Sequence, residues 1–203
     1  MRYIKTILLL TLLFPLYGKG YVSNHKLEQI RYKLLTRSGL PNTAVNKAIN
    51  FYKKNRYKKH LSKKFLAIID YTQPAYKKRL YIIDLYKNKY NRYQVAHGMR
   101  SGPINGRVTR PSNVIGSSKT PIGFFKLGHK TRTTIKKRYK YLAVVGLENR
   151  NRNAKKRQIL FHTAKYVARG GRSHGCFAIR PQDKKKVFWK MKGTLLYSYA
   201  LRK

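Results

Sequence analysis

The spacing of hydrophobic residues changes near Lys64, and this change divides the chain into two parts. Between Asn24 and Tyr57, apolar residues recur every three or four positions on either side of the segment RSGLPNT. That period is typical of amphipathic helices, and Gly39 and Pro41 within the segment are suited to end one helix and begin the next. The sequence therefore predicts a small N-terminal helical hairpin within residues 21–62.

Downstream of Lys64 the pattern becomes one of short apolar runs that favour β-strands. The runs are FLAIID, RLYIIDLY, RYQVAHG, IGFFKLG, YLAVVGL, ILFHTA and TLLYSYAL, and they are rich in β-branched and aromatic residues. Clusters of Gly, Pro, Asn and Lys separate them, as expected of turns between strands. These runs, with one short helix near PQDKKKVFWKMK, predict a mostly-β sandwich or barrel-like domain over residues 63–203.

The first twenty residues have the layout of a secretory signal. Arg2 and Lys5 precede the apolar run ILLLTLLFPL, and Gly18 and Gly20 place small residues where a signal peptidase cuts. The run is shorter than the roughly 20 residues needed to cross a bilayer. We therefore expect residues 1–20 to be a signal peptide, the protein to be exported to the periplasm or cell envelope, and no transmembrane segment to remain. An uncleaved anchor or a buried helix is the alternative.

The chain is strongly basic, with 48 Lys and Arg against 5 Asp and Glu, a formal charge of +43. Without the three basic residues of the predicted signal, Arg2, Lys5 and Lys19, the charge is still about +40. Such a surface attracts polyanions, but the basic residues are scattered and no nucleic-acid-binding module is recognisable. We therefore expect anionic polymers of the cell envelope, and no nucleic acid, as partners. A genome-wide basic bias would produce the same charge without a function.

Cys176 is the only cysteine, and it lies in the segment GGRSHGCFAIRP. Exported proteins commonly pair their cysteines in disulfides, so a single one is an inert buried thiol, an intermolecular disulfide or a nucleophile. Gly170, Gly171 and Gly175 permit backbone angles that other residues avoid. A turn built from them can direct the N–H groups of Cys176 and its neighbours toward one point, which suits an acyl-transfer centre with an oxyanion hole.

A nucleophilic thiol also needs a base, because only a few per cent of free cysteine is thiolate at neutral pH. His162 ends the apolar run ILFHTA, fourteen positions before Cys176, and is the best candidate. Positive charge from Arg172 and Arg180 is expected to favour the thiolate further. The alternative for His162 is a hydrogen-bonded histidine in the core.

Other chemistries have weaker support in the sequence. A zinc site made of His97, His162, His174 and Cys176 would lack both paired-ligand spacing and a nearby carboxylate. The five acidic residues make paired-carboxylate catalysis improbable, and Ser173 lies outside any G-x-S-x-G elbow. We therefore expect no metal and no other cofactor.

FHTAKYV and GGRSHGCFAIRP together resemble the catalytic signature of the L,D-transpeptidases of the YkuD-like superfamily, in the branch that reads HGxxYV…GRSxGC. The likeness extends upstream through VAHGMRSG and PSNVIGSSKTPIGFFKLG and covers about residues 64–200 in the same order. It implies an L,D-transpeptidase-like catalytic domain with Cys176 as the acylated nucleophile and His162 as its general base. Phe177 stands where this branch usually has proline, a departure expected to reshape the pocket floor.

The resemblance also implies supporting roles for residues around the thiol. The Thr163 carbonyl would orient the imidazole, Gly175 and the Cys176 N–H would belong to the oxyanion hole, and Arg180 would bind a substrate carboxylate. The residues implied to flank the thiol are Ser173 and His174. The residues implied to line the cleft are His97, Ser117, Ser118 and Gly123.

The activity that the resemblance implies is L,D-transpeptidation of peptidoglycan stem peptides. The thiolate attacks the carbonyl of the L-centre third residue of a tetrapeptide stem, the terminal D-alanine leaves, and an amine of a second stem resolves the acyl-enzyme. His162 transfers the protons in both halves. The alternatives are an L,D-carboxypeptidase of the same fold and a non-catalytic cationic binder of envelope polymer or nucleic acid whose thiol is inert.

Overall fold

The computed structural model describes residues 20–134 and 139–201, so the predicted signal peptide, apart from Gly20, lies outside the described residues. The N-terminal hairpin is present as α1 (Asn24–Arg37) and α2 (Asn42–Asn55). The Ser23 side chain caps α1, and Gly39 takes a φ of +72° between the two helices. Among the described residues, no helix is long and apolar enough to cross a membrane.

The rest of the chain forms one eight-stranded sheet with the strand order β3-β2-β1-β8-β4-β5-β6-β7. Its strands are β1 (Phe65–Asp70), β2 (Leu80–Asp84), β3 (Lys89–Tyr93), β4 (Gly123–Thr133), β5 (Lys140–Gly146), β6 (Leu160–Thr163), β7 (Phe177–Ile179) and β8 (Leu195–Tyr199). The short helices between them are η1 (Asn149–Ala154), η2 (Lys165–Arg169), η3 (Pro181–Asp183) and α3 (Lys184–Met191). Each of the seven predicted runs overlaps a strand, and β7 is the eighth.

The sheet curls until its two edge strands nearly meet. β8 pairs in parallel with β1 and antiparallel with β4, and β6 pairs in parallel with β7. Just beyond β3, Val95 forms an isolated antiparallel bridge with Ile179 at the end of β7. This bridge brings the edges together at one seam. The predicted mostly-β, barrel-like fold is therefore confirmed as a single, nearly closed sheet.

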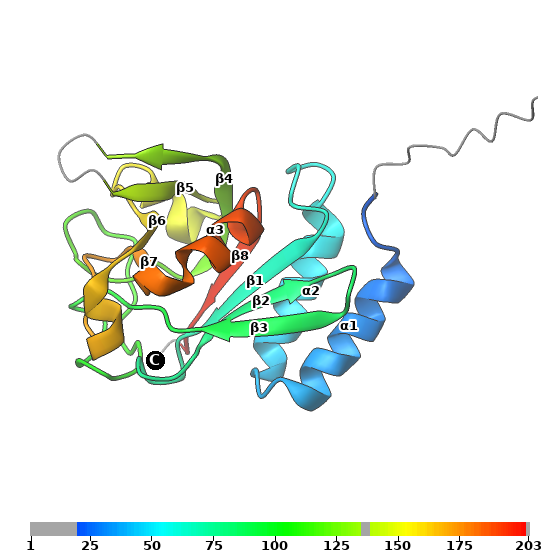
Figure 1. The fold of residues 1–203 in the computed structure, drawn as a ribbon, viewed down its shortest axis with the longest axis horizontal. Coiled ribbons are helices and arrows are strands. Elements are labelled where there is room, and N and C mark those ends of the chain that lie inside the picture. The colour runs from blue at the N-terminus through cyan, green and yellow to red at the C-terminus, as the bar shows by residue number, and fades with distance from the viewer. Residues whose placement is uncertain (1–19, 135–138, 202–203) are drawn as a thin grey trace, which may run out of the picture.

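Helices cover both faces of the first half of the sheet. Successive residues of β1 point to opposite faces, so Ala67 and Ile69 join the core under α3, whereas Leu66 and Ile68 join the core shared with α1 and α2. Figure 1 shows α1 and α2 side by side on one face, with α3 on the other. Because the N-terminal helices share a hydrophobic cluster with the sheet, the described chain packs as one body. The division at residue 62 stays a prediction.

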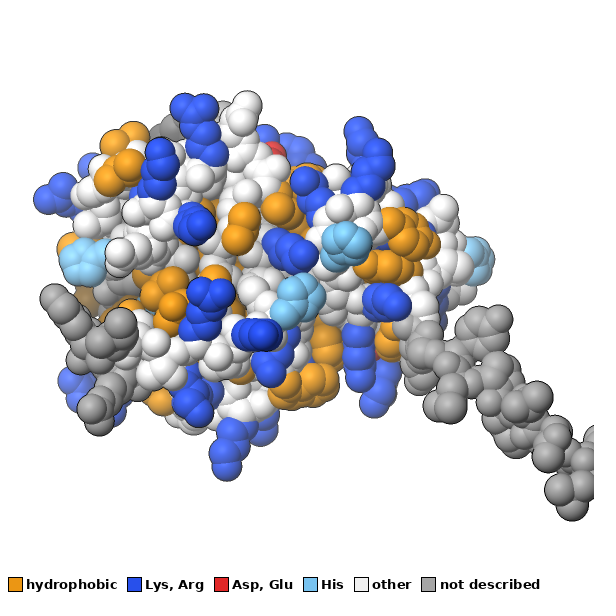
Figure 2. Space-filling model, turned by 90° about the horizontal axis from the view of Figure 1, so that it is seen from above, with side chains coloured by type: hydrophobic (Ala, Val, Ile, Leu, Met, Phe, Trp, Pro, Cys, Tyr) orange, Lys and Arg blue, Asp and Glu red, His pale blue; other side chains and the backbone are white. Residues whose placement is uncertain are grey.

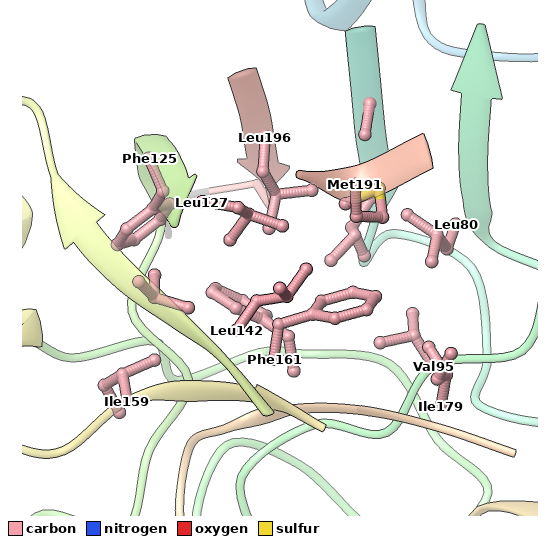
Figure 3. Packing of buried hydrophobic residues seen from close by; sticks show 14 of the residues in the cluster. Leu80, Val95, Phe125, Leu127, Leu142, Ile159, Phe161, Ile179, Met191 and Leu196 are labelled. Carbon is pink, nitrogen blue, oxygen red and sulfur yellow. The ribbon is translucent and has the colours of Figure 1, made fainter. Parts of the chain in front are cut away.

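The core under α3 also anchors β6 and β7, the two strands that overlap the resemblance motifs. Phe161 of β6 and Phe177 of β7 are fully buried, and the Phe177 ring centroid lies 5.3 Å from that of Phe125. Figure 3 shows Phe161, Phe125, Leu142 and their neighbours pointing toward one another. Burying side chains of this size stabilises the fold by about 1.5–3 kcal/mol each. Because alternate residues of a strand point to opposite faces, burial of Phe161 and Phe177 makes their immediate neighbours in the chain face away from this core.

Charged side chains are spread over the surface. Figure 2 shows Lys and Arg between apolar and uncharged side chains on one face, without a single dense patch. Among the described residues three ion pairs form, two to Glu28 and one to Glu148. Most of the positive charge is therefore not neutralised within the part of the chain that the structure describes.

Candidate active site

The parallel pairing of β6 with β7 places His162 and Cys176 on the same face of the sheet. Phe161 pairs with Phe177 and His162 with Ala178. Because alternate residues point to opposite faces, the two phenylalanines enter the core while His162 and Cys176 point the other way. Cys176 continues this register one position before β7 and is thus diagonal to His162. Ordinary strand spacing places the Cα atoms of such diagonal neighbours about 8 Å apart, within reach of two side chains.

Backbone groups of the neighbouring strand hold the thiol. Cys176 Sγ accepts a hydrogen bond from the Leu160 N–H at 3.4 Å and donates one to the Gln158 carbonyl at 3.6 Å. Burial raises the pKa of the thiol above its ordinary value, and the Leu160 N–H and the Arg157 charge only partly offset this. Burial disfavours the charged form of any acid. At neutral pH Cys176 is therefore a thiol, not a preformed thiolate.

The prediction that Arg172 and Arg180 favour the thiolate is wrong. The cation that lowers the pKa of Cys176 is Arg157, and burial outweighs it. Arg172 instead donates to the Met99 carbonyl at 3.0 Å. Arg180 follows β7, at the opposite end of that strand from Cys176, and donates to side-chain amides there.

A backbone carbonyl selects the tautomer of His162. The Nδ1 atom lies 3.0 Å from the carbonyl oxygen of Thr163, the contact that the resemblance implies. A carbonyl can only accept, so Nδ1 carries the hydrogen and Nε2 has a free lone pair when the ring is neutral. Burial lowers the pKa of His162, against the opposing effect of the Thr163 carbonyl. The ring is therefore neutral at pH 7 and able to accept a proton at Nε2.

The turn before Cys176 is locked by its own side chains and by a close backbone approach. Ser173 Oγ accepts from the Gly175 N–H at 3.0 Å and donates to the Cys176 carbonyl at 2.8 Å. Gly175 has a φ of +114°, and a Cβ there would lie 2.7 Å from the Lys119 carbonyl oxygen. Only glycine fits both the angle and the space. The N–H of Gly175 is engaged inside the turn.

Arg157 is the functional candidate that the sequence analysis missed. Its Nη1 donates to the Ser112 carbonyl at 2.6 Å and its Nη2 to the Lys119 carbonyl at 2.5 Å. Nη2 also lies 3.1 Å from the position of a Cβ on Gly175. Arg157 thus braces the 112–119 loop against the cysteine turn and brings a positive charge toward the thiol. Among 48 basic residues, no sequence pattern distinguishes it.

Ser117 and Ser118, two of the expected cleft residues, lie in the 112–119 loop, and this loop contacts His174 of the cysteine turn. His174 is exposed, and its Nδ1 lies 3.2 Å from Ser118 Oγ. Ser117, the residue before Ser118, accepts a hydrogen bond from the Lys119 N–H at 3.4 Å. The 112–119 loop is therefore joined to the turn by His174 as well as by Arg157.

The structure places the remaining expected residues elsewhere. His97 is fully buried, where its Nδ1 lies 2.9 Å from Nη2 of the buried Arg79, although its carbonyl accepts from the Ser173 N–H. Gly123 packs against Glu148 at the start of β4. Arg180 lies at the opposite end of β7 from the thiol, and the roles expected of His97 and Gly123 stay predictions. Among residues 20–134 and 139–201, no group of three or more His, Cys, Asp or Glu could hold a metal ion.

A groove of about 720 Å³ lies next to β6, lined by residues of β4, of β5 and of the segment that leads into β6. Gln158 and Leu160, whose backbones hold the thiol, line it together with Tyr139. The Tyr139 ring lies 5.1 Å from the His162 ring, centroid to centroid. The groove is therefore lined by residues that contact the thiol and the imidazole, although Cys176 and His162 themselves are not part of its lining.

Comparison with known proteins identifies the family to which the chain belongs. No curated protein matches the chain. A crystal structure of the L,D-transpeptidase (residues 123–326) from Xylanimonas cellulosilytica is similar, with 14% identity, 89% of this chain and 96% of that chain covered, and a TM-score of 0.38. The profile of the YkuD_2 family, described as the L,D-transpeptidase catalytic domain, matches residues 36–199. With most of its length matched, the chain belongs to the L,D-transpeptidase catalytic domain family.

Proposed function

We propose that the protein is an exported cysteine acyltransferase that carries out L,D-transpeptidation on peptidoglycan stem peptides. The observation that carries the proposal is the placement of Cys176 and His162 on one sheet face, with the thiol held by Leu160 and the imidazole tautomer set by Thr163. A nucleophile, a base beside it and a group that orients the base form the arrangement typical of acyl transfer through a covalent intermediate.

The reaction begins from the neutral pair. As Cys176 Sγ attacks the carbonyl carbon of the third stem residue, Nε2 of His162 accepts the thiol proton, and a tetrahedral oxyanion forms. The Cys176 N–H, at the end of the braced turn, is the donor for this oxyanion, and one such donor contributes about 3–4 kcal/mol to transition-state stabilisation. The raised pKa of the thiol makes this proton transfer necessary at neutral pH.

Collapse of the oxyanion breaks the bond to the terminal D-alanine. His162 returns its proton to the leaving amine, and a thioester between the stem and Cys176 remains. An amine of a second stem then enters the groove, His162 removes its proton during attack, and the new amide forms as the thiolate leaves and is reprotonated. The same nitrogen therefore acts as base and acid in both halves.

Export and the positive charge support an envelope substrate. Residues 1–20 read as a signal peptide, and the chain without them carries about +40, whereas wall peptides are rich in carboxylates. Electrostatic attraction of this kind raises the local concentration of an anionic partner. It is screened over about 8 Å in physiological salt.

Mass spectrometry of the intact protein after incubation with a carbapenem tests the proposal. The L,D-transpeptidases that this chain resembles are typically acylated by that drug class, so the wild-type protein should gain one drug mass. Cys176→Ala should gain none, and His162→Gln should gain it at least about 100-fold more slowly, the usual contribution of a general base. Incubation with a tetrapeptide stem should then release D-alanine from the wild type only.

An unmodified wild-type protein, or an adduct that survives in Cys176→Ala, would contradict the proposal. His25→Gln serves as the control, because His25 is exposed on α1, outside the groove lining. This variant should be acylated at the wild-type rate.

A further inference from the structure

A second pocket lies at the seam where the two edges of the sheet meet. It has a volume of about 290 Å³ and is hereafter called the seam pocket. Its lining residues are Lys78, Asn91, Arg92, Tyr93, Gln94, Arg180, Gln182, Asp183 and Lys186. They come from the segment before β2, from β3 and the residue after it, from the segment after β7 and from the start of α3. Because Cys176 and Arg180 flank opposite ends of β7, the pocket and the thiol are separated by about 13 Å of extended chain.

The hydrogen-bonding groups that the seam pocket offers are mostly donors. Three side-chain amides line it, and the oxygen of each already accepts a hydrogen bond from a cation of the protein. Lys190 donates to Asn91 Oδ1 at 3.1 Å. Arg180 donates to Gln94 Oε1 at 3.3 Å and to Gln182 Oε1 at 3.0 Å. A ligand that approaches therefore meets guanidinium, ammonium and amide N–H groups rather than free amide oxygens.

The balance of charge around the seam pocket favours an anion. Four of its nine lining residues are cations, whereas two of eleven are cations in the groove beside the thiol. Asp183 is the one acid in the lining, and none of the ion pairs among the described residues includes it. Arg180 Nε is buried and has no protein partner among the described residues. The lining of the seam pocket therefore has a higher share of cations than the lining of the groove beside the thiol.

We propose that the seam pocket binds an oxyanion group, a phosphate or a carboxylate, of an anionic polymer. Arg180 is held in a fixed orientation by Gln94 and Gln182, and a planar guanidinium in a fixed orientation suits the paired oxygens of these groups. Lys78 and Lys186 provide further charge at the rim. This inference concerns a site apart from the thiol and does not rest on the proposed acyl transfer.

Isothermal titration of the full-length chain at constant ionic strength tests the proposal. Inorganic phosphate and acetate are titrated separately, so that the two arms distinguish a phosphate site from a carboxylate site. The double variant Lys78→Gln/Lys186→Gln should bind the preferred anion at least about tenfold more weakly, because charge-assisted hydrogen bonds are lost. The control is Lys77→Gln/Lys185→Gln, which removes the same net charge from exposed neighbours that do not line the pocket. Its affinity should stay within about twofold of the wild type.

Equal weakening in the two double variants would overturn the proposal, since it would show diffuse attraction to a cationic surface. Absence of saturable binding of either anion to the wild type would also overturn it. Acylation by a carbapenem is measured on the same samples and should be unchanged in both variants. A wild-type protein that is acylated but binds neither anion saturably would thus count against the seam pocket alone, and a wild-type protein that binds the anion but is not acylated would count against the proposed function alone.

Discussion

The backbone nitrogen of Leu160 lies 3.4 Å from Cys176 Sγ, so the strand that carries the candidate base also holds the candidate nucleophile. Leu160 is two positions before His162 on β6. Any shift of β6 against β7 would move the hydrogen-bond donor and the imidazole together. The phenylalanines at 161 and 177, buried on the opposite face, oppose such a shift.

The reactivity of the thiol should depend on Arg157. Burial raises the pKa of Cys176 and Arg157 lowers it, so alkylation by iodoacetamide should be slow at pH 7 and increase at alkaline pH. Arg157→Gln removes the opposing charge and should move the midpoint of the pH–rate curve to higher pH. Arg157→Lys keeps the charge and should move it less. The measurement is the alkylation rate by mass spectrometry from pH 6 to 11.

Lys156→Gln is the matched control, because Lys156 is an exposed neighbour that loses the same charge. A midpoint that moves equally in Lys156→Gln and Arg157→Gln would show general charge loss instead of a local effect. Circular dichroism separates this result from unfolding, because Arg157 also braces two loop carbonyls.

The decrease of the acylation rate at low pH should follow the protonation of His162. The base must be neutral to accept the thiol proton, and burial lowers its pKa below the ordinary value of 6.5. The rate of carbapenem acylation should therefore exceed half of its maximum at pH 6.5 and fall to half only at a lower pH. Time-resolved mass spectrometry between pH 4.5 and 8 measures the acylation rate at each pH. A half-maximal rate above pH 7 would show that another group controls the step.

Much of the fold followed from the sequence pattern, but the edges of the sheet did not. Long apolar runs such as FLAIID are buried on both faces of the sheet, and their composition alone was enough to predict them as strands. β3 is an edge strand with the polar sequence KYNRY. Because the apolar residues come after it, the sequence predicted this strand at RYQVAHG, a few positions too late. Val95 is indeed buried, but it forms a single bridge instead of a ladder. β7 has only three residues, too short for a periodic signal.

The candidate site was predicted only where local motifs carry it. Cys176, His162 and Thr163 lie within or beside two short motifs, and their contacts arise from adjacent strands. Arg157 reaches the site through contacts with carbonyls 38 and 45 positions away, which no local pattern records. The thiol pKa was predicted in the wrong direction because formal charge is visible in a sequence and burial is not.

Gly175→Ala should reduce the acylation rate by about 100-fold. The substitution meets both an unfavourable φ of +114° and the Lys119 carbonyl oxygen at 2.7 Å from the new Cβ. Displacing the thiol by about 1 Å can reduce a rate about 100-fold. Gly116→Ala is the control, since Gly116 has a φ of +75° but no atom within 4 Å of a Cβ. It should lose about 1–2 kcal/mol of stability through backbone strain and keep its acylation rate. Equal rates in the two variants would contradict the steric argument.

Acid should destabilise the fold through His97. Burial, and then the charge of Arg79, lower the pKa of His97 to about 4, against about 6.5 in an unfolded chain. Between these values the unfolded state binds the extra proton, so the stabilising contribution is complete above pH 6.5 and is lost as pH falls toward 4. An interval of about 2.5 pH units corresponds to about 3 kcal/mol. Urea unfolding at pH 7 and 4.5 should therefore show a smaller acid loss of free energy for His97→Gln than for wild type. The exposed His25→Gln should match wild type, and identical losses in all three proteins would exclude His97 as the source.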